Sequence, residues 1–409
     1  MDVGPDMAAS HSYVKIAYAM IKSSVARPLE AGRNRQLRSA ALAASMFAAI
    51  ALMGCANPRA SSSIEPTGPV ASDSVPTTKG PSIGASVAPS VAVTPSASAP
   101  ATLAWSPLQP AGSAPGARED HTWTLDPATR TGWLFGGRAG GTVFGDLWRY
   151  DLASDTWSRQ EPVGKGPAAR FGHTGTWVDG VGLVVWSGQA GSDFFDDLWT
   201  YDPAANSWRE LPTAGAVPAA RYGSCAALGP DGRLWISHGF TQDAGRFDDT
   251  QAYDFAAGRW TDETPDGTIA TIRCLHDCLW TPDGRFVLYA GQTTGTPAIG
   301  DLWSRVVSEG WTSIADGPPP PRQLYAFGAI GGTAYIFGGG AKDGSTLRDL
   351  WLLDLATVSW QPADPLGERP SGRSGATFIP DPDGSRLLLF GGKREGKALG
   401  DVWQLSIGG

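Results

Sequence analysis

Short apolar runs that end in glycine recur along the last three quarters of the chain, at intervals of about 50 residues. The runs are rich in β-branched and aromatic residues and are bounded by turn-forming residues, a pattern typical of buried β-strands. Helical periodicity is absent from this region. Each run is followed by Asp-Leu-Trp or a variant of it, a tight turn and a strand with a second tryptophan, so each interval predicts four short antiparallel strands. The glycines that end the runs are Gly137, Gly188, Gly239, Gly291, Gly339 and Gly392.

An arginine opens each interval, and an aspartate begins each Asp-Leu-Trp step. A near-constant period of this length indicates repeated supersecondary units rather than an ordinary enzyme core. The arginines are Arg118, Arg170, Arg221, Arg273, Arg322 and Arg373. The aspartates are Asp146, Asp197, Asp249, Asp301, Asp349 and Asp401.

The two ends of the repeat region complement each other. The last unit stops shortly after Trp403 and lacks the strand with the second tryptophan, whereas Trp105 lies one full period before Trp157. An N-terminal strand in this register completes the last unit and removes the open sheet edges that favour aggregation. We therefore predict an all-β domain over residues 103–409: a six-bladed β-propeller of four-stranded antiparallel blades, closed by the N-terminal strand.

The units resemble the kelch repeat family, which combines a glycine doublet such as Gly136-Gly137 with Asp-Leu-Trp, Tyr-Asp and a later tryptophan, here Trp157. The third unit departs from the pattern with Gln251, and the fourth lacks Tyr-Asp after Trp303. Copper-radical oxidases that share the propeller need a Tyr–Cys crosslink and two His ligands, and the sequence has no matching constellation. We therefore expect no cofactor and no metal.

The segment before the repeats predicts an envelope lipoprotein. Residues 1–54 combine a basic region with an apolar stretch that ends in Leu-Met-Gly-Cys55, which resembles the bacterial lipobox; an ordinary cleaved signal with an incidental cysteine is the alternative. Translation from Met20 would shorten the unusually long basic region. Residues 55–102 are rich in Ser, Ala, Pro, Thr and Val, a composition typical of a disordered linker. We expect a bacterial outer-membrane lipoprotein with its propeller in the periplasm or at the cell surface.

Charge narrows the range of partners. The chain has a net charge of −8, and the part after residue 54 is more acidic still. An acidic surface argues against nucleic acid or anionic lipid as a partner. We expect a monomer that contacts the membrane only through its lipid anchor.

Three cysteines remain within the repeats. Cys225 and Cys278 fall on the innermost strands of neighbouring blades, and a bridge from Cys225 to Cys274 or to Cys278 is possible. A bridge between Cys274 and Cys278 is disfavoured because four extended residues span about 13 Å. The run Cys274-Leu-His276-Asp-Cys278 also has the composition of a metal site, but its spread along one strand suits a tetrahedral ion poorly.

Topology places the six arginines and the variable loops on the same face of the propeller. Such loops on a repeated scaffold are typical of binding surfaces. The arginines suit carboxylates, and the cullin-adaptor kelch propellers that the domain resembles use such residues for acidic peptides. The alternative is that each arginine pairs with the aspartate of its own blade or caps backbone carbonyls. The leading hypothesis is a module that binds a peptide, protein or glycan through Arg118, Arg170, Arg221, Arg273, Arg322 and Arg373.

An enzymatic hypothesis stands beside it. Periplasmic kelch propellers include sialic acid mutarotases, which act on a carboxylate-bearing sugar. Glu119, Asp120, Asp277 or His238 could supply an acid or base here, although none falls in a motif that transfers from that family. Whether the chain has any catalytic activity is left open by the sequence.

Overall fold

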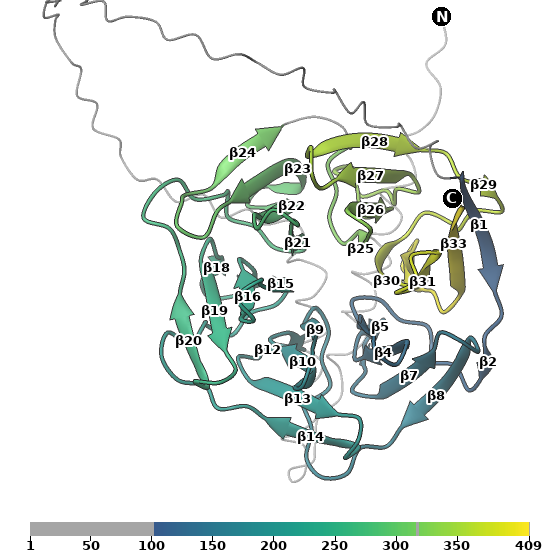
Figure 1. Ribbon diagram of the computed structural model, residues 1–409, viewed down its shortest axis with the longest axis horizontal. Coiled ribbons are helices and arrows are strands. Elements are labelled where there is room, and N and C mark those ends of the chain that lie inside the picture. Colours follow the sequence, from purple (N-terminus) through teal and green to yellow (C-terminus); the bar gives the residue numbers. More distant parts are fainter. Residues whose placement is uncertain (1–101, 316–318, 409) are drawn as a thin grey trace, which may run out of the picture. The chain divides into compact units, whose positions relative to one another are not determined.

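A computed structural model describes residues 102–315 and 319–408, and these residues form a ring of six four-stranded antiparallel blades (Figure 1). The predicted signal peptide, Cys55 and the linker up to residue 101 lie outside the described residues. The first three blades are β3 (Thr122–Asp126), β4 (Thr131–Phe135), β7 (Leu147–Asp151) and β8 (Thr156–Gln160); β9 (Thr174–Val178), β10 (Gly182–Trp186), β13 (Leu198–Asp202) and β14 (Ser207–Glu210); and β15 (Cys225–Leu228), β16 (Leu234–Ser237), β19 (Thr250–Asp254) and β20 (Arg259–Asp262).

The second half of the ring repeats this order. Its blades are β21 (Asp277–Trp280), β22 (Phe286–Thr293), β23 (Thr296–Arg305) and β24 (Thr312–Ala315); β25 (Ala326–Ile330), β26 (Thr333–Phe337), β27 (Leu350–Asp354) and β28 (Ser359–Ala363); and β30 (Ser374–Pro380), β31 (Arg386–Arg394), β33 (Val402–Gly408) and β1 (Thr102–Leu108). In the described residues, no helix is long and apolar enough to cross a membrane.

The N-terminal strand closes the ring as predicted. Strand β1 pairs antiparallel with β33, with Trp105 opposite Leu405, and forms the outer strand of the sixth blade (Figure 1). Trp105 is buried and stacks on Phe378 with ring centroids 6.1 Å apart. The first strand therefore supplies both the edge pairing and the aromatic side chain that the last repeat lacks.

Six hydrophobic clusters hold the ring together, and each lies between two consecutive blades. Short parallel pairings reinforce these interfaces at the rim. Strand β2 (Ala111–Gly112) follows β1 and pairs with β8 of the first blade, while β29 (Leu366–Gly367) follows β28 and pairs with β1. Each of these segments links the outer strand of one blade to that of the next.

A closed cycle of backbone hydrogen bonds surrounds the central channel. The residue two positions after each arginine donates its amide to the equivalent carbonyl of the preceding blade, over 2.7–3.2 Å, and Asp120 completes the cycle by donating to Gly375. All six have positive φ, which favours glycine. We call this set the hub ring; it consists of Asp120, Gly172, Gly223, Leu275, Leu324 and Gly375.

The glycine doublets have a similar role between blades. The second glycine donates its amide to the carbonyl of the next blade's arginine, as Gly137 does to Arg170 at 2.8 Å and Gly392 to Arg118 at 2.8 Å. A Cβ on Gly136 would lie 2.5 Å from the carbonyl oxygen of Arg170. Both positions of the doublet have positive φ, so they favour glycine for conformational as well as steric reasons.

Candidate binding site on the loop face

The six repeated arginines are buried inside their own blades. Each guanidinium donates two parallel hydrogen bonds to the aspartate of its blade, over 2.5–3.0 Å. Each also donates through Nε to the carbonyl two residues earlier and through Nη1 to the carbonyl that precedes the last glycine of the run; for Arg118 these acceptors are Gly116 and Gly136. Their side chains are at most 1% exposed.

This burial corrects the prediction that the arginines bind a ligand. A carboxylate from outside cannot reach these buried guanidinium groups. Each one instead joins the segment before the first strand of its blade to the end of the second strand and to the start of the third. The residues concerned are Arg118, Arg170, Arg221, Arg273, Arg322 and Arg373. The alternative pairing, with the aspartate of the same blade, is the arrangement observed. The same arginine–aspartate contact occurs in all six blades, so these arginines have a structural role.

The paired aspartates also fix the first tryptophan of each unit. Trp148 donates its indole N–H to Asp146 at 2.7 Å, and four other units repeat this contact. Partial burial acts to raise the pKa of Asp146, but hydrogen bonds from Arg118 and Trp148 outweigh it and hold that pKa below its usual value. The third unit lacks this donor because Gln251 replaces the tryptophan.

The variable loops form one face, which we call the loop face. In each of the first three blades the loop folds into a small hairpin: β5–β6 (Arg138–Ala139, Thr142–Val143), β11–β12 (Gln189–Ala190, Asp193–Phe194) and β17–β18 (Phe240–Thr241, Gly245–Arg246). The residue that follows each arginine bridges to the start of its blade's loop, as Tyr222 does to Phe240. This confirms the prediction that strand entries and variable loops share a face.

Aromatic side chains gather on the loop face of the second and third blades. The ring of Tyr222 lies 5.7–6.3 Å, between centroids, from the rings of Phe171, Phe194 and Phe240. The rings of Phe194 and Phe240 are 6.3 Å apart. Phe171 is buried and the other three are half-buried. We call these four rings, with the adjoining Arg138 and Arg246, the mouth cluster.

Two arginines flank these rings in different states. The Arg138 guanidinium lies 4.3 Å from the centre of the Phe171 ring, and its Nη2 is 2.8 Å from Oδ2 of Asp120. Arg246 lies 5.4 Å from the centre of Phe240 and donates through Nε to the carbonyl of Gln292. No carboxylate in the described part of the chain pairs with Arg246, so its charge is available to a ligand.

A second acid, Glu119, also neighbours Arg138, with its Oε1 3.5 Å from the Nε of the arginine. Glu119 is buried, and Lys393 approaches its carboxylate to 2.8 Å. Burial and the neighbouring Asp120 raise the pKa of Glu119, against the opposing effects of Arg138 and Lys393. These two acids and two bases balance one another, which leaves Arg246 as the cation of the mouth cluster that has no paired acid.

The mouth cluster was not predicted from the sequence. Its aromatic members at Phe171 and Tyr222 occupy the position directly after the repeated arginine, which holds Glu119, Cys274, Gln323 and Ser374 in other units. Because this position varies from unit to unit, the scaffold does not require any one residue there. Its variation beside an invariant arginine could have identified Phe171 and Tyr222 as candidate binding residues.

A disulfide joins the inner strands of the third and fourth blades. Cys225 on β15 bonds to Cys278 on β21, which settles the two pairings that the sequence left open, and Cys274 is a buried free thiol. Burial raises the pKa of Cys274 to about 11, so it is a poor nucleophile. In the described residues, no three His, Cys, Asp or Glu side chains are grouped closely enough to hold a metal ion.

The four candidate acid–base residues do not converge on one site. His238 is fully buried, and burial together with Arg273 lowers its pKa to about 3. Glu119 pairs with Lys393 on the loop face. Asp120 and Asp277 both line the central channel, but Asp120 is held by Arg138. Nothing in this arrangement favours the mutarotase alternative.

The fold and the loop face together define a closed, six-bladed propeller with an aromatic and cationic surface at the mouth of its hub. Residues 97–291 and 265–408 match the family described as the KLHDC2/KLHL20/DRC7 Kelch-repeats domain. The chain therefore belongs to the kelch-repeat family.

Curated relatives share this similarity. The chain is 27% identical over 292 residues to Kelch domain-containing protein 2 of Bos taurus, which covers 59% of this chain and 68% of that protein. It is 29% identical over 280 residues to Kelch domain-containing protein 1 of Homo sapiens, covering 57% and 66%, and 27% identical over 208 residues to the human Rab9 effector protein with kelch motifs, covering 46% and 53%. The matched part thus spans about two thirds or less of each of these relatives.

Proposed function

We propose that this protein is a binding module that takes a segment of a protein partner on its loop face, at the mouth cluster. Similar kelch propellers are protein-interaction modules, and the name of one relative describes an effector of Rab9. The observation that carries the proposal is Arg246, an arginine without a paired acid, beside the rings of Tyr222 and Phe240. Aromatic and arginine side chains dominate the binding energy of protein interfaces.

The chemistry of the mouth cluster favours a partner segment with a carboxylate. The terminal nitrogens of Arg246 can grip a carboxylate with two hydrogen bonds. The half-buried rings of Phe194, Tyr222 and Phe240 offer a flat apolar surface to the adjoining part of the ligand. A peptide or glycan carboxylate supplies the same chemistry.

Selection from a displayed peptide library tests this proposal. The full chain is immobilised, and enrichment is compared for the wild type, the double variant Arg246→Ala/Tyr222→Ala and the control Arg209→Ala, whose arginine is exposed on the outer strand β14. We expect carboxylate-rich peptides to be enriched on the wild type and the control, and to be lost from the double variant. Equal enrichment on all three proteins, or none above bare support, contradicts the proposal.

We further propose that the module is tethered to the outer membrane of a bacterial envelope by a lipid on Cys55. The Leu-Met-Gly-Cys55 sequence and the following linker support the anchor. The Cys225–Cys278 disulfide supports an oxidising compartment. Metabolic labelling with a fatty acid should mark the wild type and leave Cys55→Ser unmarked; label on both proteins, or on neither, would refute the anchor.

A further inference from the structure

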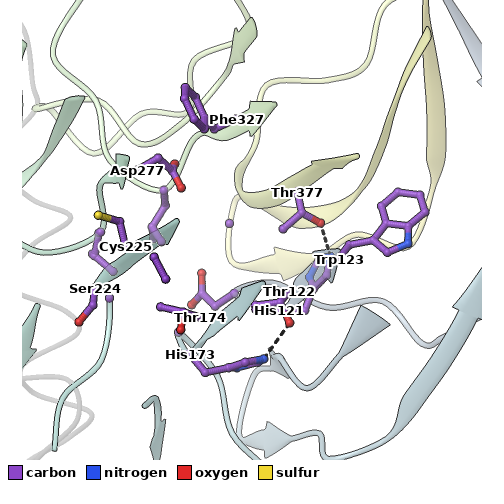
Figure 2. Close-up of a pocket in the computed structure, with 18 of the residues that line it drawn as sticks. His121, Thr122, Trp123, His173, Thr174, Ser224, Cys225, Asp277, Phe327 and Thr377 are labelled. Atoms are coloured by element: carbon purple, nitrogen blue, oxygen red, sulfur yellow. Dashed lines mark hydrogen bonds between the residues drawn. The ribbon is translucent and has the colours of Figure 1, made fainter. Parts of the chain in front are cut away.

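The central channel forms a second cavity, apart from the mouth cluster. Its volume is about 240 Å³, and the innermost strands of all six blades line it, from β3 round to β30 (Figure 2). The hub ring lies at one end of this lining.

One residue in the channel lining breaks the symmetry of the repeat. Asp277 occupies the fourth position after its arginine, where the other units carry hydroxyl, thiol or methyl side chains: Thr122, Thr174, Cys225, Ala326 and Thr377. The three threonines already have partners, because Thr122 and Thr377 bond to histidine rings and Thr174 donates to a backbone carbonyl. Cys225 is in the disulfide. Among the described residues, Asp277 has no side-chain hydrogen bond and no ion pair.

The surroundings of Asp277 provide no opposite charge. The Tyr325 hydroxyl, from the next blade, accepts a hydrogen bond from the amide of Asp277 at 3.0 Å and donates to the carbonyl of Tyr289 at 2.7 Å, so it makes no hydrogen bond to the carboxylate. Three buried histidine rings lie in the same lining: His276, which directly precedes Asp277, His121 and His173. Burial holds their pKa values below the usual range, so they are neutral. Burial raises the pKa of Asp277 to about 7, consistent with a carboxylate that lacks a counter-ion.

An aromatic ring completes the site. Phe327, on the adjacent strand β25, lines the same channel as Asp277 (Figure 2). A carboxylate accepts hydrogen bonds from an ammonium group, and an aromatic face attracts the cation and packs against its methylene groups. A cavity of this size admits a short alkyl chain.

We propose that the central channel binds a primary ammonium group, with Asp277 as its hydrogen-bond acceptor and Phe327 beside its methylene groups. The ammonium group belongs either to a free small amine or to a lysine side chain that a partner inserts. This binding activity is independent of the loop-face proposal, because it uses none of the mouth cluster.

Thermal melting of the full chain at pH 8.5 with n-butylammonium tests the site. We expect a saturable rise in the melting temperature of the wild type, no rise with the neutral probe 1-butanol, and no rise for Asp277→Asn. Glu161→Gln removes an exposed carboxylate and should respond as the wild type does. At pH 5.5, below the pKa of Asp277, the rise in the wild type should shrink.

Asp277→Asn should fold, because it replaces a half-buried carboxylate with a neutral side chain of the same shape, and circular dichroism checks this. A wild type that does not respond to n-butylammonium, or an Asp277→Asn protein that responds as strongly, overturns the proposal. The peptide acetyl-Gly-Lys-Gly-amide distinguishes the two sources. Stabilisation by this peptide supports an inserted lysine, and stabilisation by n-butylammonium alone supports a free amine.

Discussion

The amide of Asp120 donates a hydrogen bond of 3.0 Å to the carbonyl of Gly375, and so joins the first blade of the propeller to the last at the hub. This contact completes a cycle that passes through every blade. At the rim, the N-terminal strand β1 pairs with the C-terminal strand β33 and completes the sixth blade. Two separate seals, one at the hub and one at the rim, therefore hold the ring shut.

Removal of strand β1 should open the rim seal. Deleting residues 102–108 exposes the edge of β33 and leaves Phe378 without its stacked Trp105. We expect a large fall in melting temperature and aggregation through the free edge. Deletion of residues 85–91, of equal length, serves as the control. If the two deletions melt alike, the closure has no energetic role.

The buried arginine–aspartate pairs should dominate the stability of each blade. Replacing Arg322 by Met removes two hydrogen bonds from the carboxylate of Asp349, which is 34% exposed, and a loss of hydrogen bonds to a charged group costs about 1.5–3 kcal/mol. Urea unfolding of Arg322→Met measures this loss, with the exposed Arg209→Met as control. A change below about 1 kcal/mol, the range of surface ion pairs, would show that the pair is not structural.

The Cys225–Cys278 bridge should stabilise the joint between the third and fourth blades. It closes a loop with a sequence separation of 53 residues, for which chain entropy gives about 4 kcal/mol. Melting of Cys225→Ala/Cys278→Ala should fall below that of the wild type, and a reductant should lower the wild type but not the variant. Cys274→Ser tests the assignment, because it should keep its sensitivity to reductant.

Acid should destabilise the propeller through its buried histidines. Burial, with the nearby Arg170, lowers the pKa of His173 to about 3, whereas an unfolded histidine titrates near about 6.5. Between these values the unfolded chain binds the extra proton, so stability is complete above about pH 6.5 and falls as the pH drops, by up to about 1.4 kcal/mol per pH unit for each such residue.

Unfolding free energies measured from pH 7 to pH 5 check this dependence. His173→Gln should reduce the slope by one proton's share, while exposed substitutions such as Glu161→Gln should leave it unchanged. A variant that retains the full wild-type slope would show that His173 does not contribute.

One substitution should stabilise the protein. Ser187 occupies the first position of a glycine doublet with φ of 65°, and its hydroxyl is buried without a hydrogen-bond partner. Ser187→Gly removes both penalties and should add about 1 kcal/mol of stability. Gly136→Ala makes the opposite change at the equivalent position of the first blade and should destabilise. A destabilised Ser187→Gly protein would contradict this account of the doublet.

The repeat made the architecture predictable from sequence, because the spacing of Arg118 and its equivalents and the register of Trp105 define both the units and their closure. The role of those arginines was harder to read, since a guanidinium that grips a ligand and one that grips Asp146 require the same spacing. The partner of Cys225 could not be chosen from the sequence because Cys274 and Cys278 are close together in the next blade. In the structure Cys278 lies on the inner strand β21, where it bonds to Cys225, whereas Cys274 lies before that strand.

The mouth cluster depends on contacts that no periodicity encodes. Tyr222 and Phe194 come from different blades, and their ring centroids lie 6.1 Å apart. Arg246 lies in a hairpin whose equivalents in the first two blades carry Val143 and Phe194 at the same position, so the repeat does not encode an arginine there. Variable residues of this kind carry the individual function of a repeat protein, and their packing appears only in three dimensions.

The most direct test of the account compares the affinity of one selected carboxylate peptide for three forms of the full chain by calorimetry. Arg246→Ala should weaken binding about tenfold or more, the loss expected for a hydrogen-bonded charge, while Arg209→Ala should bind as the wild type does. Unchanged affinity in Arg246→Ala would contradict the assignment of binding to the mouth cluster.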